Sequence, residues 1–345
     1  MMFGNKKSLF LISYVVLVVA ILGGCSEVVK TRAFTYKQPI IDPDIYVDIY
    51  NPDLAWNGST LLADNHNLEH PRIIEVNMRG EIVWQYAIPN KIVRDSHPGR
   101  GLDVELLSNN NILFVLPFEG VYEVNRQGMI VWSYRDRVTH DADRLPNGNT
   151  IMVCSWGKIS DAQVKEVNSK GKVVWEWYTK DHFYKPPYKD ISDAGWTHVN
   201  AVSRHSNGNT LVSLRNFDLT VEVDAQGSVI WSFSWKSLGK GPHEPEILPN
   251  GNMLIALRKP HRVMEINRET EAIVWEYRKS GLKTIRDADR LPNGNTLIVG
   301  RTEILEVTRD GEVVWQLGVK GVSRENKDKG RWFYKAERIA IKGNK

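Results

Sequence analysis

Residues 145–149 read LPNGN and lead into the apolar run TIMV, and variants of this turn and strand occur six times in the 345-residue chain. Residues 222–231, EVDAQGSVIW, exemplify the second half of the repeat, which ends in a tryptophan. The turns begin at Asn57, Asn109, Asn147, Asn207, Asn250 and Asn293, and the closing tryptophans are Trp84, Trp132, Trp175, Trp231, Trp275 and Trp315. Each turn has its own tryptophan, so the chain is built from six similar units.

The spacing and composition of these units predict their fold. Successive tryptophans lie 40 to 56 residues apart, which suits a four-stranded propeller blade. Between them stand β-branched and aromatic residues, and Asn-Gly accepts the positive φ angles of a tight hairpin. A single four-stranded sheet cannot bury both of its faces, whereas six sheets arranged radially bury them against one another. The sequence therefore predicts an all-β fold: a six-bladed β-propeller of four-stranded antiparallel blades.

The C-terminal stretch repeats the beginning of a unit without completing it. Residues 334–339, YKAERI, imitate residues 140–145, HDADRL, the first strand of the third unit. We expect this stretch to close the ring against the first blade.

The N-terminus carries a targeting pattern. Lys6 and Lys7 precede an apolar run over residues 9–22, which ends in LGGC at residues 22–25 and is typical of a secretory signal peptide. The ending resembles a bacterial lipobox, which implies cleavage before Cys25 and lipid on its sulfur. An uncleaved membrane anchor is the alternative, although the run is short for a spanning helix. Ser26 after the cysteine resembles Gram-negative lipoproteins of the outer membrane.

These signals divide the chain into three parts. Residues 1–24 are expected to be a lipoprotein signal peptide, residues 25–40 a lipidated tether, and residues 41–345 the propeller. The predicted location is the cell envelope, lipid-anchored to the outer membrane and facing the periplasm.

Charge and cysteine content exclude several classes of function. Loss of Lys6 and Lys7 with the signal peptide lowers the formal charge from +4 to +2, and no basic run is interleaved with aromatics, so nucleic acid is not an expected partner. With Cys25 modified, only Cys154 remains, which excludes an intramolecular disulfide and a cysteine metal cluster. No cofactor is expected.

Positions that differ between the units indicate a site. One set lies seven residues before each turn asparagine, nine in the fourth unit, at the start of the predicted innermost strand beside the central channel. Three of its six members are histidines, and convergence of three histidines from adjacent blades favours a functional site. The set is Tyr50, Leu102, His140, His198, His243 and Arg286.

A second set of residues lies beside the first. The predicted second strand of each of the last three units ends in arginine: Arg215, Arg258 and Arg301. A guanidinium matches a sulfate, phosphate or carboxylate with paired donors, so the arginines favour an anion site.

The loop over residues 178–196 is unusually long and rich in aromatic residues, and it includes Trp196. It is expected either to form a wall or lid over a flat ligand or to pack against itself on the surface.

Several motifs resemble those of the bacterial arylsulfate sulfotransferase family. They are WTHVN at residues 196–200, VSLR at 212–215, GPH at 241–243 before a second LPNGN, and HDA at 140–142. The resemblance covers roughly residues 50–340 and implies transfer of a sulfuryl group from an aryl sulfate to a phenolic acceptor, through a sulfohistidine and without a nucleotide donor.

The resemblance also implies roles for individual residues. By motif position His243 is the nucleophile, while His140, His198 and Arg215 hold the sulfuryl oxygens or manage the phenol proton. Because many family members have His-Asp-Ala at the nucleophile strand, and this form occurs here at His140, the choice between His243 and His140 stays open. The expected substrate-binding residues are Arg258, Arg301, Arg286, Asn200 and Trp196.

Two readings from other classes remain open. Three histidines can bind a divalent metal, as in propeller polysaccharide lyases. Alternatively, the chain is a non-enzymatic lipoprotein that binds a partner or scaffolds an envelope complex, with histidines as polar channel lining.

Overall fold

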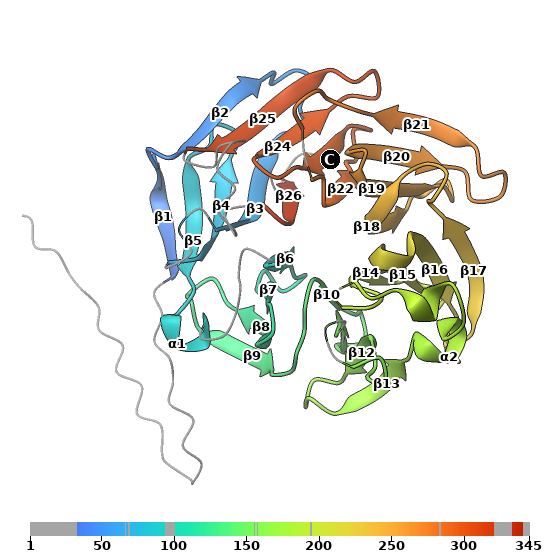
Figure 1. Cartoon of the computed structure of the whole chain (residues 1–345). Helices are drawn as coiled ribbons and strands as arrows, with labels where there is room; N and C mark the ends of the chain where they lie inside the picture. Colours follow the sequence, from blue (N-terminus) through green and yellow to red (C-terminus); the bar gives the residue numbers. More distant parts are fainter. Residues whose placement is uncertain are drawn as a thin grey trace, which may run out of the picture.

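A computed structural model describes residues 33–65, 67, 70–93, 101–154, 156, 158–193, 195–282, 284–320 and 333–340. Six antiparallel sheets surround a central channel, which confirms the predicted six-bladed propeller (Figure 1). Blades two to five have four strands each, and blades one and six carry a fifth strand on the outer edge.

Blades two to five each use four consecutive strands, ordered from the channel outward. Blade two contains β6 (Asp103–Leu106), β7 (Ile112–Leu116), β8 (Gly120–Val124) and β9 (Ile130–Tyr134). Blade three contains β10 (Ala142–Arg144), β11 (Thr150–Val153), β12 (Val164–Val167) and β13 (Val173–Trp177). Blade four contains β14 (Val199–Arg204), β15 (Thr210–Leu214), β16 (Leu219–Val223) and β17 (Val229–Ser234). Blade five contains β18 (Lys240–Ile247), β19 (Met253–Lys259), β20 (Arg262–Ile266) and β21 (Ile273–Tyr277).

The two remaining blades combine both ends of the chain. Blade one contains β26 (Ala336–Ala340), β3 (Gly58–Asp64), β4 (Arg72–Asn77), β5 (Ile82–Ala87) and β1 (Ala33–Ile40). Blade six contains β22 (Asp287–Arg290), β23 (Thr296–Val299), β24 (Glu303–Val307), β25 (Val313–Val319) and β2 (Ile45–Tyr50). The short helical segments are α1 (Asn90–Val93), α2 (Lys180–Phe183), η2 (Tyr188–Asp190) and η3 (Arg215–Phe217). None of the helices in the described ranges is long and apolar enough to cross a membrane.

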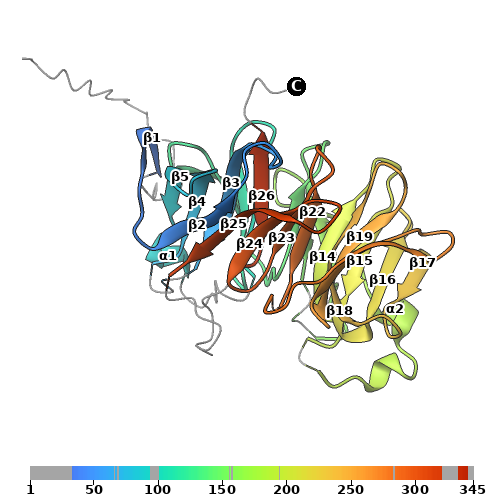
Figure 2. The ribbon, with the colours of Figure 1, turned by 90° about the horizontal axis from the view of Figure 1, so that it is seen from above.

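The C-terminal strand closes the ring, as the sequence predicts. β26 pairs with β3 in antiparallel register, with Arg338 opposite Thr60, and the two strands lie side by side in Figure 2 although they come from opposite ends of the chain. The innermost strand of blade one is therefore β26. Repeat counting places Tyr50 on that innermost strand. Tyr50 instead lies in β2, at the outer edge of blade six, where it pairs with Trp315 of β25.

The N-terminal boundary also differs from the prediction. β1 pairs with the outer edge of β5, with Thr35 opposite Trp84, so residues 33–40 belong to the sheet of blade one rather than to a tether. An added strand satisfies backbone groups that an edge strand exposes. The predicted signal peptide and Cys25 lie outside the described residues.

The repeated turn is a three-residue hairpin loop rather than the tightest kind. The Gly148 N–H donates to the Leu145 carbonyl at 2.9 Å, and only the glycine of the Asn147-Gly148 pair has a positive φ, +83°. This geometry is a type I turn followed by a left-handed residue. The Asn149 amide then donates to Glu166 on the third strand at 2.6 Å, which ties the turn to its own blade.

The repeated tryptophans join each blade to the next. The Trp132 indole N–H donates to the Ser169 carbonyl in the outer turn of blade three at 2.9 Å, while Arg144 of blade three lies 4.6 Å over the ring. Trp315 repeats this contact across the closure, donating to the Met78 carbonyl at 2.9 Å beneath Arg338 at 4.5 Å. Apolar clusters fill the space between neighbouring blades, including blades six and one. The shared residues of the repeat therefore hold the ring together.

Trp315→Ala is expected to destabilise the protein more than Trp132→Ala. Trp315 is fully buried at the closing contact, so its removal leaves a cavity that costs about 3–5 kcal/mol, whereas Trp132 is partly exposed and costs less. Urea unfolding monitored by circular dichroism measures both free energies of unfolding. Equal losses in the two variants would contradict the closing role of Trp315.

Candidate active site

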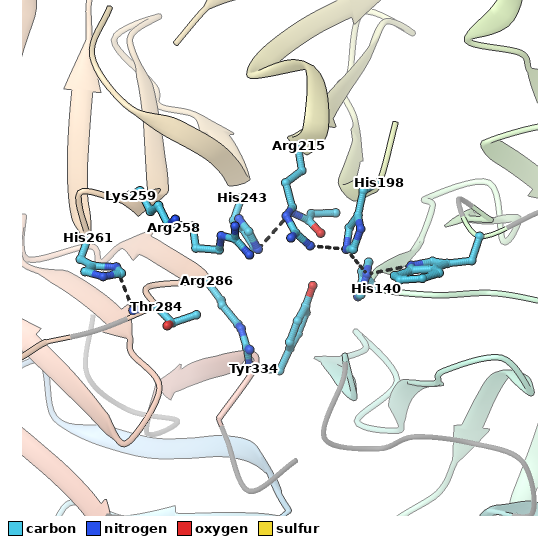
Figure 3. A pocket seen from close by; sticks show the side chains of 12 residues that line it. His140, His198, Arg215, His243, Arg258, Lys259, His261, Thr284, Arg286 and Tyr334 are labelled. Carbon is cyan, nitrogen blue, oxygen red and sulfur yellow. Dashed lines mark hydrogen bonds between the residues drawn. The ribbon is translucent and has the colours of Figure 1, made fainter. Parts of the chain in front are cut away.

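The starts of the innermost strands meet at one mouth of the channel, where they line a cavity of about 500 Å³. The structure brings together seven of the predicted site residues there: His140, His198, His243, Arg215, Arg258, Arg286 and Asn200. Figure 3 shows His140 and His198 at one end, Lys259 and His261 at the other, and His243 with Arg215 between them. Five further lining residues were not predicted: Trp156, Lys259, His261, Thr284 and Tyr334.

The hydrogen bonds of His243 determine which of its two ring nitrogens carries the proton. Nδ1 lies 2.9 Å from the Gly241 carbonyl oxygen, which can only accept, so Nδ1 carries the proton. The Asn200 amide nitrogen lies 3.0 Å from Nε2 and also donates to the Pro242 carbonyl. Nε2 therefore holds a lone pair, which Asn200 covers in the absence of ligand.

His198 and His140 form an imidazole pair beside His243. Their Nε2 atoms lie 3.1 Å apart and their rings stack at 4.9 Å. The guanidinium of Arg215 also donates to Nε2 of His198, and the Trp156 indole N–H donates to Nε2 of His140 at 3.4 Å. Trp156 packs edge-on against His198 at 4.8 Å. Each Nε2 atom of the pair is thus approached by a donor from outside it, and the pair lies beside the Arg215 cation.

Burial and positive charge keep the imidazoles neutral. Burial, then the charge of Arg215, holds the pKa of His243 well below its usual value, and burial with the neighbouring His198 does the same for the pKa of His140. Burial, then the charge of Arg258, lowers the pKa of Arg215 to about 10, so it remains a cation at neutral pH. The cavity therefore combines a neutral nucleophilic nitrogen with fixed positive charge.

Local backbone distortion aims the histidines at the cavity. His198 has φ +47° and follows a turn closed by its own N–H donating to the Gly195 carbonyl at 2.8 Å. Glu244, directly after His243, has φ +42° within a stretch where the β18–β19 register shifts. Such left-handed non-glycine residues and bulges recur at functional sites. In the fourth unit, where His198 lies nine rather than seven residues before the turn asparagine, the strand is preceded by this extra turn.

Two predicted substrate-binding residues lie outside the cavity lining. Trp196 is 7 % exposed, packs edge-on against Phe217 at 5.2 Å and donates its indole N–H to the Tyr188 carbonyl. Arg301 is absent from the lining, and its carbonyl accepts from the Phe333 N–H instead. The structure therefore does not bring these two side chains into the cavity lining with the other predicted residues.

The aromatic loop that contains Trp196 packs against itself, so the lid expectation is wrong and the surface alternative holds. Phe183 and Tyr188 contact each other at a ring distance of 5.3 Å and pack on Phe217 of η3 at 6.0 and 4.8 Å, and no described residue of the loop lines the cavity. Burial of these large apolar side chains stabilises the loop more than exposure over a channel mouth would.

Tyr334 occupies in blade one the position that His140 occupies in blade three. Its ring stacks on His140 at 5.6 Å, and the Arg286 guanidinium lies 5.2 Å from the centre of the same ring. Its hydroxyl points toward Arg215 and His198 (Figure 3). The match between residues 334–339 and 140–145 aligns Tyr334 with His140 and could have identified it. Trp156 lies in an irregular loop and has no such signal.

The histidines do not form a metal centre. Among the residues that the structure describes, no group of three or more His, Cys, Asp or Glu side chains is arranged to hold a metal ion. His243 directs its lone pair at Asn200, away from the His140–His198 pair, and Arg215 places positive charge between them. The geometry gives no support to the metal-dependent lyase reading.

The family model for arylsulfotransferase (ASST) matches residues 50–249, which include His140, His198, Arg215 and His243. The chain belongs to the arylsulfotransferase family. No curated protein matches its sequence. Membership supports an arylsulfotransferase-like function, since the matched segment contains the three histidines of the cavity and Arg215.

Solved structures share the fold with this arylsulfotransferase-family chain. A protein of unknown function from Bacteroides caccae is 21 % identical with a TM-score of 0.59, over 82 % of this chain and all of that one. A catalytically inactive virginiamycin B lyase from Staphylococcus aureus, solved with quinupristin, is 11 % identical with a TM-score of 0.51, over 78 % and 87 % of the two chains. At these identities the likeness concerns the fold alone.

Below the cavity of this family member, carboxylates line the channel around a buried lysine. Lys335 Nζ lies 3.4 Å from Asp103, 3.2 Å from Asp141 and 3.1 Å from Glu244. Asp103 and Asp141 also accept the backbone N–H groups of Ala142 and Val202 on the next blades. This belt joins blades beneath the histidines and keeps negative charge out of the cavity.

Lys335→Met is expected to lower stability more at pH 8 than at pH 5. Burial raises the pKa of Asp103 from 3.8 to about 7 even though Lys335 opposes the shift. A raised acid pKa means that the folded chain holds a proton that unfolding releases, so stability is lost as pH rises through about 7. Without the Lys335 ammonium the pKa of Asp103 rises further. At pH 8 the free energy of unfolding of the variant should therefore fall below that of the wild type by about 3–5 kcal/mol.

Thermal and urea unfolding at both pH values measure this deficit. A Lys335→Met deficit that is the same at pH 5 and pH 8 would show that the belt does not depend on the lysine charge.

Proposed function

We propose that this chain is an aryl sulfate sulfotransferase that moves a sulfuryl group to a phenolic acceptor through a sulfohistidine on His243, without a nucleotide donor. The observation that carries the proposal is the lone pair of His243 Nε2, held at the cavity by the proton on Nδ1. Family membership supports the reaction class, and the mechanism rests on this geometry.

In the first half-reaction His243 Nε2 attacks the sulfur of the aryl sulfate. The N–S bond forms as the bond between sulfur and the aryl oxygen breaks, and the phenolate leaves with that electron pair. Asn200 must release Nε2, and its amide can then donate to a sulfuryl oxygen. The phenolate leaves as an anion beside the guanidiniums that line the cavity and takes its proton from solvent.

The second half-reaction reverses these steps with another phenol. The acceptor hydroxyl gives its proton to a neutral imidazole of the His140–His198 pair, which then releases it to solvent. The acceptor oxygen attacks sulfur, and the N–S bond breaks to restore neutral His243. A neutral imidazole serves as both nucleophile and leaving group, so the energy of the sulfate ester is retained between the two steps.

Positive charge at fixed positions stabilises the sulfuryl group in transit. Arg215 is anchored on His198, so its guanidinium needs little rearrangement when negative charge develops on the sulfuryl oxygens. Tyr334 and Trp156 supply aromatic surface for the aryl ring.

His243→Ala is expected to abolish transfer while the fold is retained. With p-nitrophenyl sulfate as donor and phenol as acceptor, acceptor-dependent release of p-nitrophenol should fall at least about 1,000-fold, as expected for loss of a nucleophile. His70→Ala, at an exposed histidine far from the cavity in sequence, is the matched control and should keep wild-type turnover. Wild-type protein that shows no transfer across several phenols would instead favour a partner-binding propeller.

We also propose that the mature chain is anchored in the outer membrane through lipid on Cys25, facing the periplasm. The LGGC ending of the apolar run supports this proposal. Cys25→Ser should move the protein from the membrane fraction to the soluble or unprocessed fraction and remove incorporation of labelled palmitate. Unchanged palmitate labelling of that variant would refute lipidation at this residue.

A further inference from the structure

The cavity extends beyond the proposed sulfuryl site toward blades five and six. Arg258 and Lys259 end β19, His261 follows in the turn to β20, and Thr284 precedes β22. Figure 3 places Lys259 and His261 at the end of the cavity opposite His140, with Arg258 beside His243. The Thr284 N–H donates to Nδ1 of His261 at 3.1 Å, which links the two segments that form this end.

The charge of the cavity exceeds what one sulfuryl group requires. Four cationic side chains line it, and no aspartate or glutamate is among the described lining residues. A sulfate ester carries a single negative charge, for which Arg215 is already placed beside His198. The remaining cations are Arg258, Lys259 and Arg286.

Two of these remaining cations have no counter-charge. The side chains of Arg258 and Lys259 make no hydrogen bond or ion pair with any described residue, whereas the inner-strand arginines Arg144 and Arg290 pair with glutamates at 3.0 Å. Like charges held together are destabilising until an anion neutralises them. An uncompensated guanidinium at a cavity is therefore available to a ligand.

A glycine brings the uncompensated arginine next to the catalytic one. A Cβ atom at Gly241 would lie 3.2 Å from Cβ of Arg258 and 3.6 Å from Cγ of Arg215, so both side chains cross the space that this glycine leaves open. Gly241 also has φ +66°, which glycine adopts without strain. Arg258 is thus held within the same cavity as Arg215 but on the side away from His198.

We propose that Arg258 and Lys259 form a subsite for a second anionic group, so that the preferred donors and acceptors are aryl compounds that carry a carboxylate or sulfate in addition to the phenolic oxygen. A cavity of about 500 Å³ accommodates one substituted aromatic ring of this size. The guanidinium offers paired donors to the acid group, and the ammonium adds a point charge at the open end. Because donor and acceptor occupy the cavity in turn, the subsite selects both.

The role of this subsite in selecting substrates rests on the proposed sulfuryl transfer. Its binding of an anionic group can be measured without any transfer, so the two proposals can be tested separately. Calorimetric titration compares p-hydroxyphenylacetate with p-hydroxyphenylacetamide, which share the phenol and differ only in the charge of the side group. Wild-type protein should bind the acid at least about tenfold more tightly than the amide, as expected for one charge-assisted paired contact. In Arg258→Gln and in the double variant with Lys259→Gln the preference should fall to about threefold or less.

Lys170→Gln is the matched control, because it removes one positive charge from an exposed outer turn of blade three. It should keep the wild-type preference. The same pair of acceptors, used in transfer from p-nitrophenyl sulfate, should show the acid favoured in kcat/KM by a similar factor.

The outcomes are distinct. Equal binding of acid and amide by wild-type protein overturns the subsite whether or not transfer occurs. A preference that survives in the double variant also overturns it, since the charge would then be recognised elsewhere. Charge-selective binding that is lost in the variants, without any transfer, supports the subsite while removing the proposed reaction.

Discussion

The pairing of β26 with β3 is the contact on which the ring and its cavity depend. It closes a sheet whose strands come from both ends of the chain, and it places Tyr334 and Lys335 in the channel. The buried ion pair of Arg338 with Glu306 at 2.8 Å and the stacking of Arg338 on Trp315 hold this closing strand against blade six. Since each blade buries its faces only against neighbours, loss of one closing contact exposes two blade faces at once.

Closure also separates charge along the channel. Above Lys335 the side chains facing the cavity are imidazoles, guanidiniums and a phenol, and around and below it carboxylates bind backbone N–H groups of the next blade. Lys335 lies at the boundary and compensates three of these carboxylates. The arrangement keeps acceptor oxygens away from the anion-binding end, where they would repel a sulfuryl group, and it uses them to join the inner strands instead.

The fold could be predicted because its determinants are local and repeated. A tryptophan that packs on the next blade recurs in every unit, and a left-handed turn residue, glycine in units three to six and Asn110 in unit two, recurs in five, so one sequence can be compared with itself. The same comparison located His140, His198, His243 and Arg215, whose positions relative to the turns are preserved in space. It could not place Tyr334 by counting from Asn57, because the innermost strand of that blade comes from the other end of the chain.

The remaining differences have physical causes of other kinds. Trp196 was expected at the ligand, but burial against Phe217 outweighs exposure at the channel mouth. Trp156 reaches His140 and His198 from the connection between β11 and β12, which is longer than the corresponding connections of the other blades. The tautomer of His243 depends on a contact with the Gly241 carbonyl, which follows from a local bulge and not from residue type.

In the proposed mechanism His243 carries the sulfuryl group between donor and acceptor. Labelling of the enzyme with an aryl sulfate containing radioactive sulfur, followed by alkaline quench and peptide mapping, tests it most directly. Label is expected on the peptide that contains His243, and phenol added before the quench should remove it. Label on the peptide that contains His140, or turnover without any labelled protein, would contradict it.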